Sequence, residues 1–167
     1  MRCGIALGSN LGDRLAHLRQ ARESVLALAT PGHPVLASAV YETEPVDCAP
    51  GTAPYLNAVM EIEYDGQPMI LLDALQQIES EHGRPSKRPR NAPRTIDLDV
   101  LYAGNLVLSN DEIVIPHPRL HSRRFVLQPL HDIRPSLLLP GYHETVEQLL
   151  SSLPPSPAVT RVSETWD

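Results

Sequence analysis

The first forty residues alternate short apolar runs with turn residues. Residues 3–7 form an apolar run that predicts a strand ending at Gly8. Between residues 11 and 28, apolar positions recur every three or four residues, which predicts an amphipathic helix with Ser9 or Asn10 near its start. Residues 35–40 follow a Pro/Gly stop and are rich in β-formers, so they predict a second strand.

The middle of the chain repeats this order. Two kinds of side chain alternate over residues 55–64, one face being more polar than the other, which predicts a strand. Apolar residues recur about every 3.6 positions over residues 68–81, which predicts a second long helix. Strict alternation returns over residues 95–102 and predicts another strand. The turn that follows leads into residues 106–108, which with residues 113–115 complete a predicted hairpin.

The predicted order is β-α-β-β-α-β, which is typical of the α+β ferredoxin-like fold, an antiparallel sheet with two helices on one face. The hairpin and a helical segment at about residues 143–153 are additions to it. We therefore expect a single domain over residues 1–153. Residues 154–167 show little periodicity and predict a loosely ordered tail, with Trp166 as its one potential anchor.

Composition narrows the class of protein. A chain of 167 residues with 42% hydrophobic and 20% charged residues has the size and core of one globular domain. Its net charge of -6 argues against a general nucleic-acid binder. No membrane span or signal peptide is evident, which predicts a cytoplasmic protein. Cys3 and Cys48 form no zinc motif and are expected to be reduced.

Positive charge is concentrated in two segments. Residues 84–94 hold five arginines and lysines, and their three prolines exclude a regular helix or central strand. Arg119, Arg123 and Arg124 form the second group. An isolated loop of this kind is usually only solvated, but here acidic residues follow it directly. Forked arginine contacts to phosphate would give such a loop a function.

Those acidic residues are Asp97 and Asp99, which a strand places on one face about 7 Å apart. Mg²⁺ would relieve their repulsion, because it takes carboxylate oxygens and leaves positions for water and phosphate. An isolated pair is usually a polar surface, but beside the cationic loop it predicts a magnesium–nucleotide site. The chain contains neither a P-loop nor a dinucleotide-binding motif, nor a credible nucleophile motif.

A second group of residues suits a flat, polar ring. Tyr55 and Asn57 share one strand face, and Phe125 is the chain's one phenylalanine, able to cover the other side of a ring. His117 lies between two prolines and could donate to a phosphate. An ordinary strand surface, core packing and a structural loop histidine remain equally good interpretations of these residues at this point.

Four stretches resemble the 6-hydroxymethyl-7,8-dihydropterin pyrophosphokinase family: Ile5–Gly12, Tyr55–Ala58, Arg94–Asp99 and Pro116–Arg119. The resemblance runs from about Gly4 to about Pro140. It implies a ferredoxin-like fold and transfer of pyrophosphate from ATP to the hydroxymethyl oxygen of the pterin, with release of AMP, in folate biosynthesis.

The resemblance also implies roles for individual residues. Asp97 and Asp99 match the ligands of two Mg²⁺ ions and, with Arg84 and Arg94, the catalytic positions. The positions that match pterin contacts are Thr43, Val46, Tyr55, Asn57 and Phe125. The positions that match ATP contacts are Gln76, Glu79, Arg84, Arg94, His117 and Arg123.

Three residues depart from one form of the family and leave the adenine and ribose contacts open: Asn91, Glu112 and Pro118 replace a tryptophan, an arginine and a tyrosine. The loops 47–54 and 84–93 are expected to close over the reactants. We expect a monomer whose partners are ATP and the pterin. The alternatives are a ferredoxin-like module that binds nucleotide without turnover, and a metal-dependent phosphohydrolase that needs no pterin.

Overall fold

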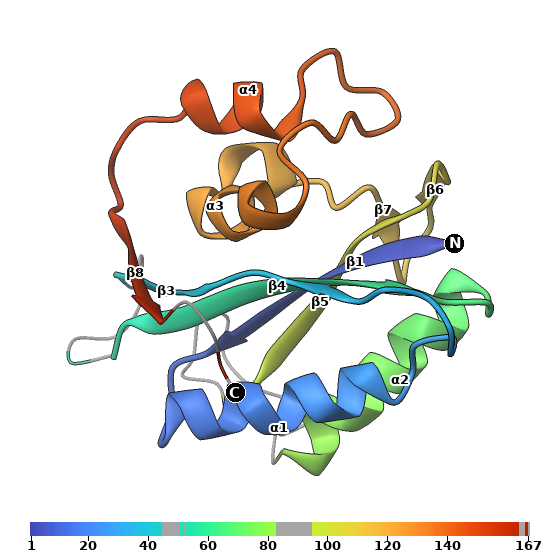
Figure 1. The fold of residues 1–167 in the computed structure, drawn as a ribbon, viewed down its shortest axis with the longest axis horizontal. Helices are drawn as coiled ribbons and strands as arrows, with labels where there is room; N and C mark the ends of the chain where they lie inside the picture. The colour runs from blue at the N-terminus through green and yellow to red at the C-terminus, as the bar shows by residue number, and fades with distance from the viewer. Residues whose placement is uncertain (45–50, 52, 83–94, 164–165, 167) are drawn as a thin grey trace.

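A computed structural model of the chain describes residues 1–44, 51, 53–82, 95–163 and 166 (Figure 1). The strands are β1 (Arg2–Ser9), β2 (Leu36–Ala37), β3 (Val40–Thr43), β4 (Tyr55–Glu63), β5 (Asp97–Ala103), β6 (Leu108–Ser109), β7 (Val114–Ile115) and β8 (Val159–Ser163). The helices are α1 (Arg14–Leu26), α2 (Pro68–Glu81), the 3-10 turn η1 (Leu120–Ser122), α3 (Arg124–Ile133) and α4 (Val146–Ser151).

The main sheet follows the order β5-β1-β4-β3-β8, and β2 also pairs with β4. Every pairing in this sheet is antiparallel. The four strands β5, β1, β4 and β3 have the arrangement expected of a ferredoxin-like sheet, so this prediction is confirmed. The predicted hairpin is also present, as the pair β6 and β7. The predicted C-terminal helical segment is α4, which begins with a capping box formed by Thr145 and Gln148.

Helices cover both faces of the sheet, with α1 and α2 on one side and α3 and α4 on the other (Figure 1). Successive residues of β1 alternate between the two layers: Cys3, Ile5 and Leu7 belong to the core under α1 and α2, and Ala6 faces the opposite core. Helix α3 was not predicted. Pro129 lies inside it and removes a backbone donor, so the sequence there suggests a helix break.

The start of α1 differs from the prediction. Its N-cap is Asp13, whose carboxylate accepts a hydrogen bond from the backbone N–H of Ala16 at 3.2 Å. Ser9 and Asn10 are buried at the end of β1 and do not cap the helix. The turn between them and Asp13 passes through Gly12, whose φ of 68° favours glycine.

A buried carboxylate joins β1, β4, β5 and α3. Glu61 accepts hydrogen bonds from Arg2 at 2.7 Å, from Arg134 at 2.6 Å and from the Tyr102 hydroxyl. Burial alone would raise the pKa of Glu61, but the hydrogen bonds from these three residues outweigh it and lower that pKa. Gly4 makes room for this arrangement, because a Cβ there would overlap the Tyr102 ring.

The expectation of a loosely ordered tail is wrong for the residues of β8. This strand pairs along β3 from Val40 to Thr43 and extends the sheet. Trp166 is buried in the core under α1, and its indole N–H donates to the Ser38 carbonyl at 2.9 Å. The strand follows a Pro-rich stretch and is short, which explains why its alternation gave no recognisable pattern.

Candidate active site

One row of residues crosses four strands of the sheet. In the strand registers Asp97 of β5 lies opposite Gly8 of β1, Gly8 opposite Asn57 of β4, and Asn57 opposite Tyr41 of β3. Directly opposed residues share a face, so Asp97, Asn57 and Tyr41 all lie on the face that carries α3. Because strands are spaced by about 4.8 Å, Asp97 and Asn57 begin roughly 10 Å apart.

Gly8 places no side chain in the middle of this row, which lets the Asn57 amide approach the backbone there. A Cβ at this position would lie 3.2 Å from the amide nitrogen of Asn57, which is tighter than ordinary packing. The next residue of β1 on the same face is Ala6, which lies opposite Asp99. At these two positions the strand between the two predicted binding regions therefore contributes only a hydrogen atom and a methyl group to this face.

Asp97 and Asp99 are both half-buried and share the face of this row. Among the residues that the structure describes, no cluster of three or more His, Cys, Asp or Glu side chains could hold a metal ion. A pair of carboxylates without further acidic ligands does not make an all-protein cage. It does fit Mg²⁺, which commonly uses one or two carboxylates and completes its shell with water and substrate phosphates.

The two helix residues that match ATP contacts lie elsewhere. Glu79 is 4% exposed, and its Oε2 accepts a hydrogen bond from the backbone N–H of Leu98 at 2.9 Å. Leu98 belongs to the core under α1 and α2, whereas Asp97 and Asp99 face the other layer. Gln76 is exposed on the same helix as Glu79. The structure thus brings Glu79 against the backbone of the acidic strand, on the side away from its carboxylates.

The residues that match pterin contacts come together at the ends of β3 and β4. Thr43 lies opposite Tyr55, one step along the same face from the pair of Tyr41 and Asn57. Thr43 Oγ1 and Asn57 Oδ1 are buried and have no hydrogen-bond partner among the described residues. Buried polar atoms nearly always have a partner, so these two favour a polar ligand at this place.

His117 has a defined tautomer and a strongly shifted pKa. Its Nδ1 accepts a hydrogen bond from the backbone N–H of Arg119 at 3.1 Å, so the proton of the neutral ring is on Nε2. Burial, followed by the charges of Arg123 and Arg119, lowers the pKa of His117 from 6.5 to about 4. At neutral pH the ring is uncharged and offers one Nε2–H donor.

Phe125 and Arg123 lie at the start of α3. Phe125 is in the first turn of α3 and packs partly against the core beneath that helix, so core packing accounts for part of its surface. The Arg123 guanidinium lies 5.4 Å from the centroid of the Phe125 ring, within cation–π range. The structure therefore brings a predicted phosphate contact and a predicted ring contact side by side. Val46, Arg84 and Arg94 lie outside the described residues.

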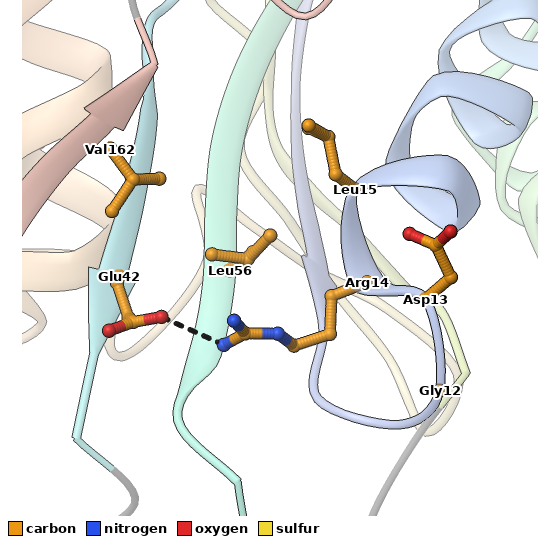
Figure 2. A pocket seen from close by; sticks show the side chains of 7 residues that line it. All are labelled: Gly12, Asp13, Arg14, Leu15, Glu42, Leu56 and Val162. Atoms are coloured by element: carbon orange, nitrogen blue, oxygen red, sulfur yellow. Dashed lines mark hydrogen bonds and ion pairs between the residues drawn. The ribbon is translucent and has the colours of Figure 1, made fainter.

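A cavity of about 370 Å³ lies on the other face of the sheet (Figure 2). Leu56 of β4 and Leu15 of α1, which both contact the core on that face, form part of its wall. Arg14 crosses it to reach Glu42 at 2.9 Å and the Pro54 carbonyl at 2.7 Å. The cavity is therefore separate from the acidic row, and Arg14 ties α1 to the backbone just before Tyr55.

Sequence reasoning missed Gly8 as the centre of the row and Glu79 as a partner of the β5 backbone. The signal for Glu79 was present, because it lies four residues after Leu75 on the apolar stripe of its helix. A carboxylate at such a position needs a buried partner.

Among the described residues, none of the helices is both long and apolar enough to cross a membrane.

Solved structures define the class of fold. The chain superposes with a TM-score of 0.69 on a crystal structure of HPPK-DHPS in complex with substrates, at 12% sequence identity. The match covers 90% of this chain and 45% of that one, so the chain spans less than half of that protein. At this identity the likeness concerns the fold alone, and it agrees with the ferredoxin-like α+β fold predicted from the sequence.

Sequence comparisons identify the family. A sequence model of the 7,8-dihydro-6-hydroxymethylpterin-pyrophosphokinase (HPPK) family matches residues 4–135, and the chain belongs to that family. The Haemophilus influenzae 2-amino-4-hydroxy-6-hydroxymethyldihydropteridine pyrophosphokinase is 42% identical over 138 residues, 82% of this chain and 84% of the relative. The enzyme of the same name from Methylorubrum extorquens is 40% identical over 156 residues, 93% and 95% of the two chains. The family resemblance and the enzyme class predicted from the sequence are confirmed.

Proposed function

We propose that this chain transfers the pyrophosphate group of ATP to the hydroxymethyl oxygen of 6-hydroxymethyl-7,8-dihydropterin and releases AMP, a step of folate biosynthesis. One observation carries the proposal beyond family membership. The row from Asp97 through Gly8 to Asn57 joins a carboxylate pair suited to Mg²⁺ with buried polar atoms that have no partner among the described residues and suit a polar ring.

The pterin would lie at the ends of β3 and β4. Asn57 Oδ1 would accept from the ring edge, and Thr43 would contribute hydrogen bonds beside it. Tyr55 and Phe125 would cover the two ring faces by stacking. For Phe125 this requires that the Arg123 guanidinium, now 5.4 Å from its ring centroid, shares or leaves that position. Val46 would add a backbone contact.

The nucleotide would lie over β5 and the start of α3. Asp97 and Asp99 would hold two Mg²⁺ ions, which supply charge neutralisation of the triphosphate. His117 would donate its Nε2–H to a phosphate oxygen, and Arg123 would add a positive charge. Arg84 and Arg94 are the further ATP contacts we propose, whereas Gln76 and Glu79 lie on α2, across the sheet from the two carboxylates. Arg84 and Arg94 would stabilise charge on the transferred group.

The reaction itself is a displacement at phosphorus. The hydroxymethyl oxygen forms a bond to the β-phosphorus, the bond from that phosphorus to the bridging α,β-oxygen breaks, and AMP leaves with this oxygen. The hydroxyl proton is released. The contribution of the chain is to hold the two reactants in line across Gly8 and to stabilise charge, because no covalent intermediate is needed.

The decisive test is AMP formation from Mg-ATP with and without the pterin, with product masses recorded and a chelator control. Pterin-dependent AMP together with the pterin diphosphate supports the proposal. AMP or ADP formed without pterin would indicate a phosphohydrolase. Binding of ATP without turnover would indicate a nucleotide-binding module. We further propose a cytoplasmic monomer, which light scattering of the purified protein would check for its oligomeric state.

A further inference from the structure

Two parts of the C-terminal region, β8 and Trp166, contact β3 and the residues just before it. Strand β3 is short and ends at Thr43. Strand β3 has four residues, and β4 pairs with only three of them. On its other side β8 pairs with β3 from Val40 to Thr43, with Val159 opposite Thr43. Without β8, β3 would be a four-residue edge strand, which is a poorly fixed element on which to mount a binding residue.

On the α3 face a cluster of side chains fixes the middle of β3. Arg161 of β8 lies opposite Tyr41, with its guanidinium 5.8 Å from the ring centroid and 3.3 Å from the hydroxyl. The Tyr41 hydroxyl donates to Asp132 of α3 at 2.8 Å, and Asp132 also accepts from the Ala39 backbone N–H at 3.1 Å. Arg161 reaches Asp132 at 3.6 Å. Tyr41 is therefore held by β8 and α3 together.

On the α1 face Trp166 holds the residues that precede β3. Its indole N–H donates to the Ser38 carbonyl at 2.9 Å, and its own carbonyl accepts from Arg19 Nε at 2.9 Å. The Arg22 guanidinium lies 5.7 Å from the indole centroid. Trp166 is 2% exposed, so its indole is packed in the core under α1 rather than resting on the surface.

These contacts bear on the candidate site through the strand register. Tyr41 lies directly opposite Asn57, and Thr43 lies directly opposite Tyr55. A shift of β3 would therefore move Thr43, and it would also move Tyr41, the residue beside Asn57. The acidic residues would be less affected, because Asp97 and Asp99 are on β5 at the far end of the sheet order.

We propose that Arg161 and Trp166 are positioning residues for the pterin half of the site, acting by clamping β3 from its outer edge. The inference rests on the proposed function, since it concerns the affinity for that substrate. Their effect is selective for the pterin because β3 carries Thr43 and no residue that we assign to ATP.

The test measures pterin and ATP affinities separately in the full-length protein. Arg161→Ala removes the clamp on Tyr41, and Arg161→Lys keeps a positive charge near Asp132. Trp166→Phe keeps a ring in the core and removes the donor to Ser38. Thr145→Ala is the matched control, because it removes the N-cap of α4 and lowers stability in the same C-terminal region without touching β3.

We expect Arg161→Ala and Trp166→Phe to raise the pterin Kd by roughly 3- to 10-fold, measured by calorimetry with α,β-methylene ATP present. The Kd of the ATP analogue should stay within about twofold, Arg161→Lys should recover part of the loss, and Thr145→Ala should leave the pterin Kd unchanged. Hydrogen exchange at residues 40–43 should become faster in Arg161→Ala and Trp166→Phe alone.

Two results would overturn the inference. One is an unchanged pterin Kd in both Arg161→Ala and Trp166→Phe. The other is an equal loss of affinity for both ligands, because that would show general destabilisation. A wild-type protein that neither binds the pterin nor releases pterin-dependent AMP would contradict the proposed function, and the inference would fall with it. The wild-type measurement therefore separates the two failures.

Discussion

The carboxylate of Glu79 accepts a hydrogen bond from the backbone N–H of Leu98 at 2.9 Å, and Leu98 is the residue between Asp97 and Asp99. A side chain of α2 therefore holds the backbone from which the two predicted metal ligands project on the opposite face. This relationship gives Glu79 a positioning role that is separate from any contact with ATP.

Glu79→Ala should lower both stability and turnover. The change leaves the Leu98 N–H buried without its acceptor, which costs roughly 1–3 kcal/mol. Glu79→Gln retains an acceptor oxygen and should be milder on both counts. Gln77→Ala, an exposed change on the same helix, serves as control. Chemical denaturation and kcat measured side by side check this, and a normal kcat in Glu79→Ala would contradict the positioning role.

Asp97→Asn and Asp99→Asn should each reduce kcat by at least about 100-fold while leaving pterin affinity nearly unchanged. The reason is that these carboxylates face the nucleotide half of the row and the pterin acceptors lie on β3 and β4. Rapid-quench measurement of AMP gives the rate, and calorimetry gives the affinity. Asp65→Asn, in the exposed turn after β4, is the acidic control. Undiminished turnover in both variants would remove Asp97 and Asp99 from the site.

Asn57→Leu should separate binding from stability. In the free protein the buried Oδ1 has no partner among the described residues, so replacing it with a methyl group should leave stability within about 1 kcal/mol of the wild type. Pterin affinity should fall by about 100-fold or more, because a site built to hydrogen-bond a ring edge discriminates strongly when the polar group is lost. Thermal unfolding and calorimetry check the two halves, and unchanged affinity would exclude Asn57 as the edge contact.

His117 should stay neutral throughout the range from pH 6 to pH 8 in the ligand-free protein. Its pKa is lowered from 6.5 to about 4, so the unfolded chain takes up the proton first as the pH falls. The stabilising contribution of the neutral ring is therefore present above pH 6.5 and is lost as the pH falls towards 4. An NMR titration of the imidazole, assigned with His117→Gln, measures this. A midpoint near 6.5 would contradict the buried, cation-flanked environment.

Two glutamates on β4, Glu61 and Glu63, provide a matched test of how much the buried hydrogen-bonded carboxylate of Glu61 stabilises the fold. Glu61→Ala removes the shared partner of Arg2, Arg134 and Tyr102 and should lower the free energy of unfolding by roughly 2–4 kcal/mol. The cost is not larger because both arginines still reach solvent. Glu63→Ala removes a half-buried partner of the N-terminal amine and should lower stability less than Glu61→Ala does. The pKa of Glu61 is lowered from 4.5, so its contribution is present above about pH 4.5 and is lost as the pH falls through the lowered pKa. Urea unfolding at pH 7 and pH 4 would reveal both effects.

Period-two patterning explains how much of the site the sequence could predict. It placed Asp97 with Asp99 and Tyr55 with Asn57, since each pair is within one strand. The register between strands is a long-range property, so the row through Gly8 could not be inferred. Helix α3 was hidden by Pro129 and β8 by its shortness after a Pro-rich stretch. In each case tertiary packing decided what the local pattern left open.

Strand β5 stands at one end of the described sheet, so its outer row of backbone groups has no neighbouring strand there. Exposed edges of this kind recruit strands from other molecules and start aggregation. Glu79 occupies part of that edge with a negative charge, which a foreign strand would have to displace and leave buried. The same carboxylate thus orders the strand of the predicted metal ligands and protects it from intermolecular pairing. Variants at position 79 should therefore be judged by solubility at high concentration as well as by rate.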